Sequence, residues 1–351
     1  TFVFGGSTCP FGIPPPGTTL NLRDSNLKNS NLKIMWFVFD SIIFFTLFFS
    51  AYWMYIIIRS FFYPKKQTRK SELIRICFLV ILLTCFVLVL YGSFIEPKII
   101  RTKQINLDLK QTDKKENIKI ALISDLHVGR YKKSFFINRV VKKIDNYEPD
   151  LILLGGDYIL GKEKYAYYLQ PLEKLSKKYP IFAVTGNHEF GLAYEGAPRH
   201  KDKTKTLREL FKKWNIEILD NKTAKISVDK NDFNLTGIPD IWTQKDNLHV
   251  AKYNLDPRTP NILLCHNPDI ILDKESEIFD LILSGHTHGG QIRLPWLGSV
   301  PSLPTELGRP FDKGLFKIKQ TVLYISSGLG ETGTRARLFD PPEINIITLD
   351  L

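Results

Sequence analysis

Residues 118–127 read Ile-Lys-Ile-Ala-Leu-Ile-Ser-Asp-Leu-His, so a short apolar run is followed directly by an aspartate and a histidine. The same arrangement recurs four more times along the chain. The later polar clusters are Gly155-Gly156-Asp157, Gly186-Asn187-His188-Glu189, Cys265-His266-Asn267 and Gly285-His286-Thr287-His288. In α/β proteins, polar residues just beyond the ends of buried strands can converge on one site. The repeated pattern therefore predicts an α/β domain with a polar site at its strand ends.

Short apolar runs alternate with helical or turn-like stretches from residue 118 onward, which is typical of an α/β domain. The predicted strands are 118–123, 151–154, 181–184, 262–265, 281–283, 322–325 and 344–349. The predicted helices are about 134–147, 164–178 and 204–214. We therefore expect one domain over residues 118–351.

The five clusters offer carboxylate oxygens, imidazole nitrogens and one amide oxygen, a donor set that suits Mn, Fe or Zn better than Ca. Two ions with four ligands each and one shared carboxylate need about seven residues. The clusters supply seven candidates: Asp125, His127, Asp157, Asn187, His266, His286 and His288. His188 remains, and it suits proton donation or stabilisation of a phosphoryl oxygen. The sequence thus predicts a centre of two divalent metal ions with His188 as its catalytic residue.

Each cluster alone has an ordinary structural explanation, because Asp-x-His occurs by chance and a His-Thr-His pair can serve packing. The clusters together are different, since five of the seven histidines fall in them. We expect the other two, His200 and His249, on the surface. Glu189 either supports the site or bonds local backbone, and Cys265 alternates away from His266 toward the core.

The order Asp-x-His, Gly-Asp, Gly-Asn-His-Glu, His, Gly-His-x-His resembles the calcineurin-like metallophosphoesterase superfamily. The resemblance implies a four-layer α/β/β/α sandwich with the metals at the strand ends. It also implies a ligand partition. One ion would take Asp125, His127, Asp157 and His288, and the other would take Asp157, Asn187, His266 and His286, so that Asp157 bridges them.

A narrower resemblance, to the membrane-associated bacterial branch that includes UDP-2,3-diacylglucosamine pyrophosphatase-type enzymes, follows from motifs late in the chain. These are Gly289-Gly290-Gln291, Leu294-Pro295-Trp296, Ser327-Gly328-Leu329-Gly330, Arg335, Arg337 and Pro341-Pro342-Glu343. Arg293, Arg335 and Arg337 either bind an anionic headgroup, since guanidinium pairs well with phosphate, or form ordinary ion pairs.

The first third of the chain contains two long apolar runs, residues 34–58 and 76–95, and the first holds a single charge, Asp40. Each is long enough to cross a bilayer, so residues 34–96 predict two transmembrane helices with a short loop between them. Residues 1–33 are rich in Gly, Pro, Asn and Ser, and we expect them to be disordered or non-native. Met35 is the first methionine, which suggests a native start there or a fragment. Residues 97–117 are expected to be a charged connector.

The net charge of +12 is concentrated in the first third, where a basic loop joins the two apolar runs. Basic short loops favour the cytoplasmic side, so the catalytic domain is expected outside the cytoplasm of a bacterial cell membrane. A nucleic-acid partner is not favoured, because the second half lacks a basic run interleaved with aromatic residues. The cysteines offer neither a disulfide framework nor a zinc site.

These observations predict a membrane-anchored phosphoesterase that hydrolyses a phosphodiester or pyrophosphate bond by a metal-bridging hydroxide. The expected partners are the bilayer and a phosphorylated small-molecule or lipid-linked envelope substrate. Two alternatives remain open: an anchored nucleotide or nucleic-acid phosphodiesterase, and a catalytically inactive membrane scaffold. The sequence leaves the substrate, the native metal and the oligomeric state undetermined.

Overall fold

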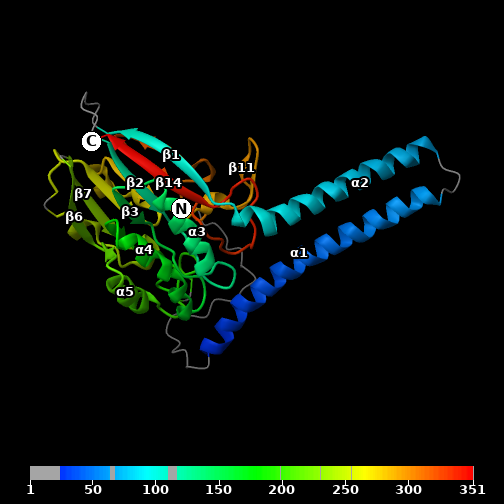
Figure 1. The fold of residues 1–351 in the computed structure, drawn as a ribbon, viewed down its shortest axis with the longest axis horizontal. Coiled ribbons are helices and arrows are strands. Elements are labelled where there is room, and N and C mark those ends of the chain that lie inside the picture. The colour runs from blue at the N-terminus through cyan, green and yellow to red at the C-terminus, as the bar shows by residue number, and fades with distance from the viewer. Residues whose placement is uncertain are drawn as a thin grey trace, which may run out of the picture.

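The computed structural model describes residues 24–63, 68–109, 117–197, 199–229, 231–253 and 255–350, with side chains from residue 36 onward. Two six-stranded sheets lie face to face, and two long helices project away from them (Figure 1). The apolar runs that predicted strands form the middle of these sheets, because strands buried on both faces need apolar side chains on both faces.

The first sheet has the strand order β1-β14-β2-β3-β4-β5, and β14 is antiparallel to β2 but parallel to β1. Its strands are β1 (Arg101–Asp108), β2 (Asn117–Ile123), β3 (Leu151–Leu154), β4 (Ile181–Ala183), β5 (Glu217–Ile218) and β14 (Glu343–Asp350). From β2 to β5 all neighbours are parallel, so their carboxyl ends meet at one edge of the sheet.

The second sheet has the order β12-β13-β9-β8-β7-β6. Its strands are β6 (Lys222–Val228), β7 (Asn231–Ile238), β8 (Asn261–Cys265), β9 (Leu281–Ser284), β12 (Gly314–Ile318) and β13 (Thr321–Ile325). The central strands β7, β8, β9 and β13 are parallel. A separate hairpin pairs β10 (Arg293–Leu294) with β11 (Gly298–Ser299).

Side-chain alternation along the strands divides the core into three apolar layers. In β2, Leu122 packs between the two sheets, whereas Ala121 and Ile123 face the helices outside the first sheet. In β8, Leu264 faces the first sheet and Leu263 packs against the short helices on the far side. The strand period of two thus produces four layers, and the predicted α/β/β/α sandwich is confirmed.

The outer layers are unequal. Longer helices cover the first sheet, and short turns of helix cover the second. The helices on the first sheet are α3 (Ser134–Asp145), η3 (Glu163–Leu172), α4 (Glu173–Ser176) and α5 (Thr204–Lys213). The short helices that follow are η4 (Ile241–Thr243), α6 (Leu248–Ala251), η5 (Pro268–Leu272), η6 (Lys274–Ile278), η7 (His288–Gly290) and η8 (Arg309–Phe311). The three predicted helices correspond to α3, to η3 with α4, and to α5.

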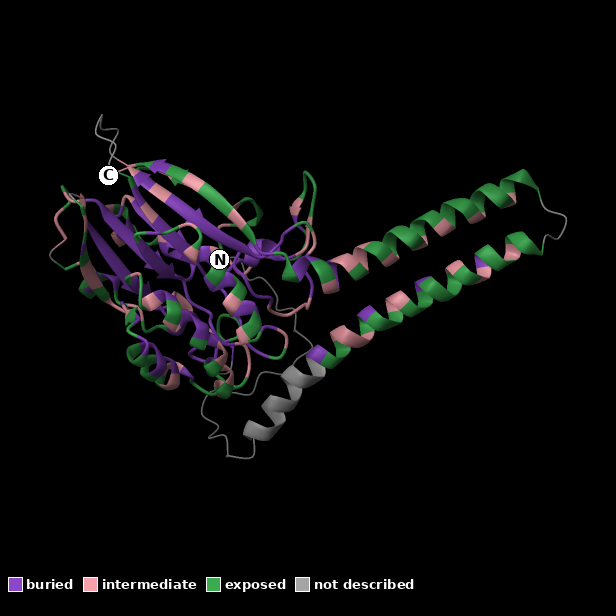
Figure 2. Ribbon diagram, viewed as in Figure 1, coloured by how far each residue is buried: buried purple, intermediate pink, exposed green. Residues whose placement is uncertain are grey.

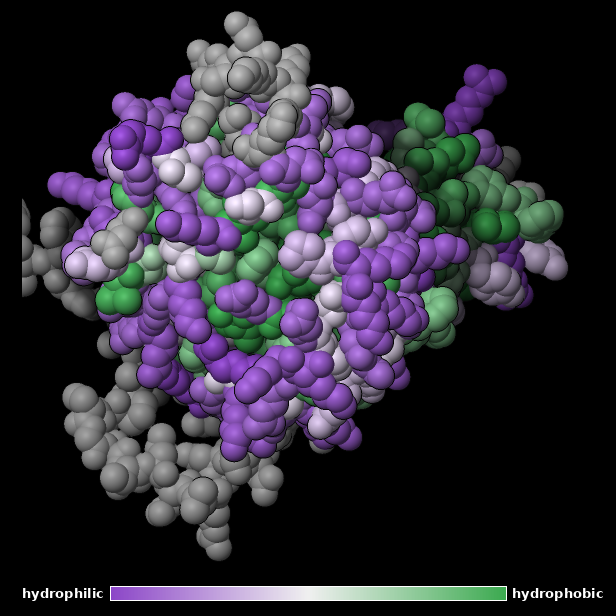
Figure 3. Space-filling view, turned by 60° about the vertical axis from the view of Figure 1, so that its left-hand side comes forward, coloured by the Kyte–Doolittle hydropathy of each residue, from purple (hydrophilic) through white to green (hydrophobic). Residues whose placement is uncertain are grey.

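The two apolar runs form the projecting helices α1 (Asp24–Phe62) and α2 (Arg69–Leu90). After α2 the chain continues into the short helices η1 (Tyr91–Ile95) and η2 (Glu96–Lys98). Two stretches are long and apolar enough to cross a membrane: Trp36–Phe62 within α1, and Arg69–Lys98, which runs from α2 through η1 and η2. Most of their side chains are exposed (Figure 2), whereas a core helix of similar composition would be buried. Figure 3 shows these apolar helices behind a largely hydrophilic face of the domain.

Residues 24–33, in the segment expected to be disordered or non-native, form the first turns of α1, which begins at Asp24. Extension of an existing helix adds one hydrogen bond per residue without a new nucleation step, so polar residues continue it. The rest of that segment, residues 1–23, lies outside the described residues.

The segment expected to be a charged connector, residues 97–117, contains β1. Its polar side chains are mostly exposed, which is compatible with an edge strand that has only β14 as a neighbour. The chain therefore passes from α2 directly into the first sheet.

The helices are tied to the domain where they leave it. Asp40, the single charge of the first apolar run, accepts hydrogen bonds from Tyr131 Oη (2.7 Å) and Arg335 Nη1 (2.9 Å). The Arg335 guanidinium also lies over the Tyr131 ring at 4.2 Å, and the Trp36 ring meets that ring edge-on at 5.2 Å. At the end of α2, the Gly92 carbonyl accepts from Arg337 N–H at 2.9 Å. A carboxylate inside an apolar run is thus explained by partners in the domain.

Candidate metal centre

The predicted ligands follow five strands whose carboxyl ends meet between the two sheets. β2, β3 and β4 of the first sheet and β8 and β9 of the second each end one to four residues before one of the polar clusters. Because β2, β3 and β4 are parallel to one another, as are β8 and β9, their polar loops gather on one side of the sandwich. The structure brings the clusters together as the sequence predicted.

Asp157 lies at the middle of the gathered side chains. Its Oδ2 is 3.1 Å from His266 Nε2, 3.6 Å from His127 Nε2 and 3.8 Å from His188 Nε2. A Cβ at Gly186 would collide with this carboxylate, so only glycine leaves room for it there. One carboxylate therefore reaches imidazoles that come from both sheets.

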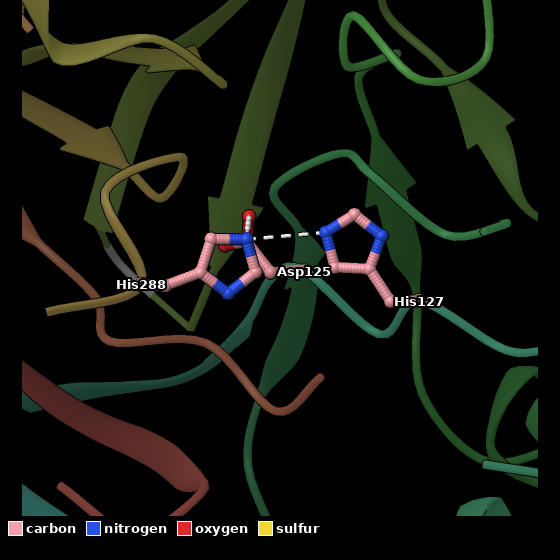
Figure 4. A group of neighbouring side chains, drawn as sticks. All are labelled: Asp125, His127 and His288. Carbon is pink, nitrogen blue, oxygen red and sulfur yellow. Dashed lines mark hydrogen bonds and ion pairs between the residues drawn. The ribbon is translucent and has the colours of Figure 1, made fainter. Parts of the chain in front are cut away.

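A second group lies beside the first. His288 Nε2 is 3.3 Å from Asp125 Oδ1 and 3.1 Å from His127 Nε2 (Figure 4). The Nε2 atoms of His127 and His288 face each other beside the Asp125 carboxylate, as expected for donors that share a cation. Among the described residues, three groups of side chains could hold a metal ion: Asp125 with His127 and His288, His127 with Asp157 and His188, and Asp157 with His266 and His286.

Backbone contacts orient several of these side chains and leave one donor atom of each directed into the centre. His266 Nδ1 contacts Gly155 O at 2.6 Å, and Asn187 Nδ2 donates to Leu192 O at 2.9 Å. The buried atoms His286 Nε2 and Asn187 Oδ1 have no hydrogen-bond partner among the described residues. Buried polar atoms without a partner are costly, and a metal ion would satisfy both. The donor set therefore fits a transition-metal centre.

Burial controls the protonation of the histidines. Loss of solvent lowers the pKa of His286 to about 3 and that of His288 to about 4, and it lowers the pKa of His127 well below its usual range. Neutral imidazoles keep the lone pair that metal binding requires. Burial opposes ionisation of Asp157, but the histidines around it, His266 first, hold its pKa well below the usual range. The carboxylate is thus charged, and the rings of His127, His286 and His288 are neutral and can bind cations. Burial opposes protonation of His266, but the carboxylates around it, Asp157 first, hold its pKa well above the usual range.

Five of the seven predicted ligands have a left-handed backbone conformation: Asp125 (φ 52°), His127 (φ 42°), Asp157 (φ 55°), His286 (φ 71°) and His288 (φ 55°). Such angles are uncommon for residues other than glycine, and each costs of order 1–3 kcal/mol. Strained backbone that clusters in one place marks a site where geometry serves something other than stability.

Glu189 fixes the loops that carry two of the clusters. Its carboxylate accepts four hydrogen bonds, from the N–H groups of Asp157, Tyr158, Ile159 and Gly186, at 2.9–3.1 Å. Three of these donors belong to the loop after β3 and one to its own loop after β4. Glu189 therefore both bonds local backbone and supports the site, so the two expectations left open are both met.

Asp240 is a site residue that the sequence analysis missed. It follows β7, is fully buried, and its Oδ2 lies 3.8 Å from His286 Nδ1 without a hydrogen-bond partner among the described residues. Burial raises its pKa to about 7. The Trp242 ring meets the His286 ring edge-on, with 4.3 Å between centroids. The available signal was weak, because β7 reads Asn-Asp-Phe-Asn-Leu-Thr-Gly-Ile and only Pro239 stands between this strand and Asp240.

The late arginines form internal contacts rather than a free anion site. Arg337 is fully buried and donates to the carbonyls of Ser327, Gly330 and Asp340 at 2.7–2.9 Å, so the idea that it binds a headgroup is wrong. Arg293 forms an ion pair with Asp312. Arg335 pairs with Asp40 as described above. Ion pairing, the simpler alternative, therefore describes Arg293 and Arg335, whereas Arg337 is held inside the domain mainly by backbone carbonyls.

The remaining predictions on single residues concern burial. His200 and His249 are exposed, as expected, and His249 Nδ1 lies 3.5 Å from Glu275. Cys265 is buried on the face of β8 that packs against the short helices, also as expected.

Comparison with known proteins agrees with the geometry. Residues 118–290 match the family model described as calcineurin-like phosphoesterase. An uncharacterized metallophosphoesterase of Helicobacter pylori (strain J99) is 33% identical over 82% of this chain and 73% of the relative. Phosphodiesterase YaeI of Escherichia coli is 32% identical over 66% of this chain and 82% of the relative. UDP-2,3-diacylglucosamine pyrophosphatase LpxG of Chlamydia muridarum is 26% identical over 74% and 92%. The motifs, the sandwich and these relatives together place the chain among the calcineurin-like metallophosphoesterases, which makes it a phosphoric ester hydrolase.

Proposed function

We propose that this protein is a membrane-anchored phosphoesterase with two metal ions that cleaves a phosphodiester or pyrophosphate bond in a lipid-linked substrate. The observation that carries the proposal is the attachment of the site to two apolar helices with exposed side chains. Contacts such as Asp40 with Arg335 and Gly92 with Arg337 hold the helices against the loops that flank the site. The active site would then lie close to the bilayer surface, where lipid headgroups are.

The proposed ligands divide into two sets that share Asp157. His127, His288 and Asp125 would join it at one ion, and His266, His286 and Asn187 would join it at the other. The distances around Asp157 Oδ2 support its shared position, since imidazoles of both sets lie within 3.1–3.6 Å of it. Two such ions would supply an activated water and neutralise charge on the phosphoryl oxygens. The metals remain a choice among Mn, Fe and Zn.

His188 would act on the phosphoryl group from the edge of the centre. It is less buried than the predicted ligands, and its Nε2 lies 3.8 Å from Asp157 Oδ2. Burial lowers its pKa to about 4, so its ring is neutral near pH 7 and offers one N–H. We assign it a hydrogen bond to a phosphoryl or leaving oxygen, which stabilises charge that grows in the transition state.

The bilayer orientation follows from the basic loop between the helices, which would face the cytoplasm of a bacterial cell. The catalytic domain would then lie on the extracytoplasmic side. A reporter fused after residue 350 tests this, because a periplasmic reporter would be active and a cytoplasmic one silent. The opposite result would reverse the orientation and leave the metal centre as it is.

The substrate is tested with the full chain in lipid vesicles with Mn²⁺. We expect release of a nucleoside monophosphate from a UDP-linked diacyl sugar, the substrate class in the name of the Chlamydia muridarum relative. A soluble bis-aryl phosphodiester, a cyclic nucleotide and DNA serve as comparisons. Turnover of nucleotides or DNA alone would refute the lipid substrate and favour an anchored nucleotide phosphodiesterase. Absence of turnover together with absence of bound metal would favour a scaffold.

A further inference from the structure

The β10–β11 hairpin carries exposed apolar side chains at its tip. Trp296 is fully exposed, Leu297 is two-thirds exposed and Leu294 is 44% exposed. Single exposed apolar residues are ordinary, but neighbouring ones at the tip of a projecting hairpin mark a contact surface. This hairpin begins five residues after His288, so it adjoins the metal centre in the chain.

The turn at the hairpin tip places Trp296 in a backbone conformation that a bulky residue disfavours. Leu297 N–H donates to Leu294 O at 3.2 Å, which closes a turn with Pro295 second and Trp296 third. Trp296 has φ 65°, a value that favours glycine or asparagine at this position and disfavours a bulky side chain. A ring that is fully exposed gains no packing in return. A tryptophan is therefore held outward at the cost of stability, as expected if it contacts something outside the domain.

The hairpin is connected to the end of α2 through one intervening segment. Arg337 N–H donates to Gly92 O (2.9 Å) at the end of α2, and Leu338 N–H donates to Gln291 O (2.8 Å). Arg293 N–H donates to Leu338 O (2.9 Å), so β10 lies beside this segment. Figure 1 shows the hairpin next to the domain end of α2. The tip thus lies near the level at which α2 leaves the domain.

The surface between the hairpin and α2 combines apolar and basic side chains. Trp296, Phe339 and Arg309 line one open hollow of ≈ 540 Å³, and Phe339 is half exposed. The Phe339 N–H donates to Glu96 in η2 at 2.9 Å, which joins the hollow to the end of α2. Tryptophan and arginine around one hollow are typical of the lipid headgroup region, where the ring is half solvated and the guanidinium meets phosphate.

We propose that the β10–β11 tip, with Trp296 and Leu297, enters the headgroup region of an anionic bilayer beside the two helices. The proposal rests on the membrane anchoring proposed above. The helices alone would fix the distance of the domain from the bilayer, whereas a second contact would also fix its tilt. Because Arg293 Nη1 donates to Gly289 O (3.3 Å), one residue after His288, the contact would orient the side of the metal centre that the hairpin borders.

The test measures depth directly in the full chain. All four native cysteines are replaced, and a nitroxide is attached at Trp296→Cys, at Leu297→Cys or at the control Tyr253→Cys, an exposed aromatic position in the turn after α6. Each protein is reconstituted in vesicles of phosphatidylcholine and phosphatidylglycerol. Collisions with lipid-soluble oxygen are compared with collisions with a water-soluble nickel chelate. We expect the oxygen-to-nickel ratio at 296 and 297 to exceed that at 253 by about tenfold, as for a partition free energy near 1.4 kcal/mol.

Equal ratios at the three positions would overturn the hairpin contact. Two labelled tip positions guard against a single substitution that disturbs the turn. Resistance of the wild-type chain to alkaline carbonate extraction reports on the helices separately, so anchoring can hold while the hairpin contact fails. If the oxygen-to-nickel ratio at position 296 rises only in vesicles with phosphatidylglycerol, basic side chains such as Arg309 contribute to the contact. If it rises equally in pure phosphatidylcholine, the apolar side chains at the tip make the contact.

Discussion

Replacement of Glu189 tests how the loops around the proposed metal centre are held. Its carboxylate accepts four buried backbone N–H groups, two at each oxygen. Glu189→Gln keeps one oxygen and turns an NH₂ group toward two of these donors, whereas Glu189→Ala leaves all four without a partner. A buried donor without a partner costs about 1 kcal/mol at the low end. We therefore expect losses of about 2 kcal/mol for Gln and about 4 kcal/mol for Ala.

These free energies translate into melting temperatures. For a domain of this size, 1 kcal/mol corresponds to about 2–4 °C. The thermal unfolding of the full chain in micelles is followed by near-ultraviolet circular dichroism at one scan rate. The melting temperature should fall by about 4–8 °C for Glu189→Gln and by about twice as much for Glu189→Ala. Turnover should also fall by about 10- to 100-fold in Glu189→Gln, because three of the donors belong to the loop that carries Asp157.

The matched control is Glu195→Gln, an exposed glutamate in the same loop region. A surface change of this kind is expected to stay within about 0.5 kcal/mol of the wild type. If Glu189→Ala melts together with this control, the four hydrogen bonds do not hold the loops, and the reasoning above is refuted. If Glu189→Gln and Glu189→Ala lower the melting temperature equally, the loss of stability does not depend on how many backbone N–H groups are left without an acceptor.

Four further outcomes are expected. Asp157→Asn should lower turnover by more than about 100-fold without release from membranes, and near-normal turnover would contradict a shared carboxylate. Chelation should lower the melting temperature by several degrees in a scanning calorimeter, since an ion at about 100 times its Kd adds about 2.7 kcal/mol. Burial lowers the pKa of Lys132 to about 8. The folded protein then binds fewer protons than the unfolded one between about pH 8 and 10.5, so stability falls as the pH drops through this window, and Lys132→Met should remove that slope in urea titrations. Arg337→Lys should destabilise by about 2–3 kcal/mol in the same titrations, because an ammonium cannot reach three separate carbonyls as the guanidinium does.

The sequence predicted the central strands and the proposed site together, for one physical reason. Strands such as 151–154 are buried on both faces, so their side chains are apolar without interruption. The chain can change to Gly, Asp and His only where the strand ends. A polar cluster directly after an apolar run therefore identifies the end of a buried strand. Because the strands are parallel, these ends and their clusters lie on one side of the sheet. His188 and Asn187 could be found in this way before any coordinates.

Edge strands and buried charges were not predictable in the same way. β1 reads Arg-Thr-Lys-Gln-Ile-Asn-Leu-Asp, which resembles a charged linker because most of its side chains meet solvent. Arg337 looked available to an anion, yet it is buried by carbonyls from the segment 327–330 and from Asp340. Such a partner set is assembled only by the tertiary fold. Asp240 was missed because β7 contains Asn, Asp and Thr and lacks the apolar run that identified the other strands.

The position of β14 also has a consequence for how the protein is made. This strand, residues 343–350, lies between β1 and β2 in the first sheet, although both of them are synthesised more than 200 residues earlier. The two apolar helices would leave the ribosome and enter the membrane long before β14 exists. Until residue 350 emerges, β1 lacks its neighbour and β2 has an open edge, a state prone to mispairing. In the proposed orientation the nascent domain would therefore remain incomplete on the far side of the bilayer. A stop codon just before residue 343 should leave an inserted chain that proteases remove.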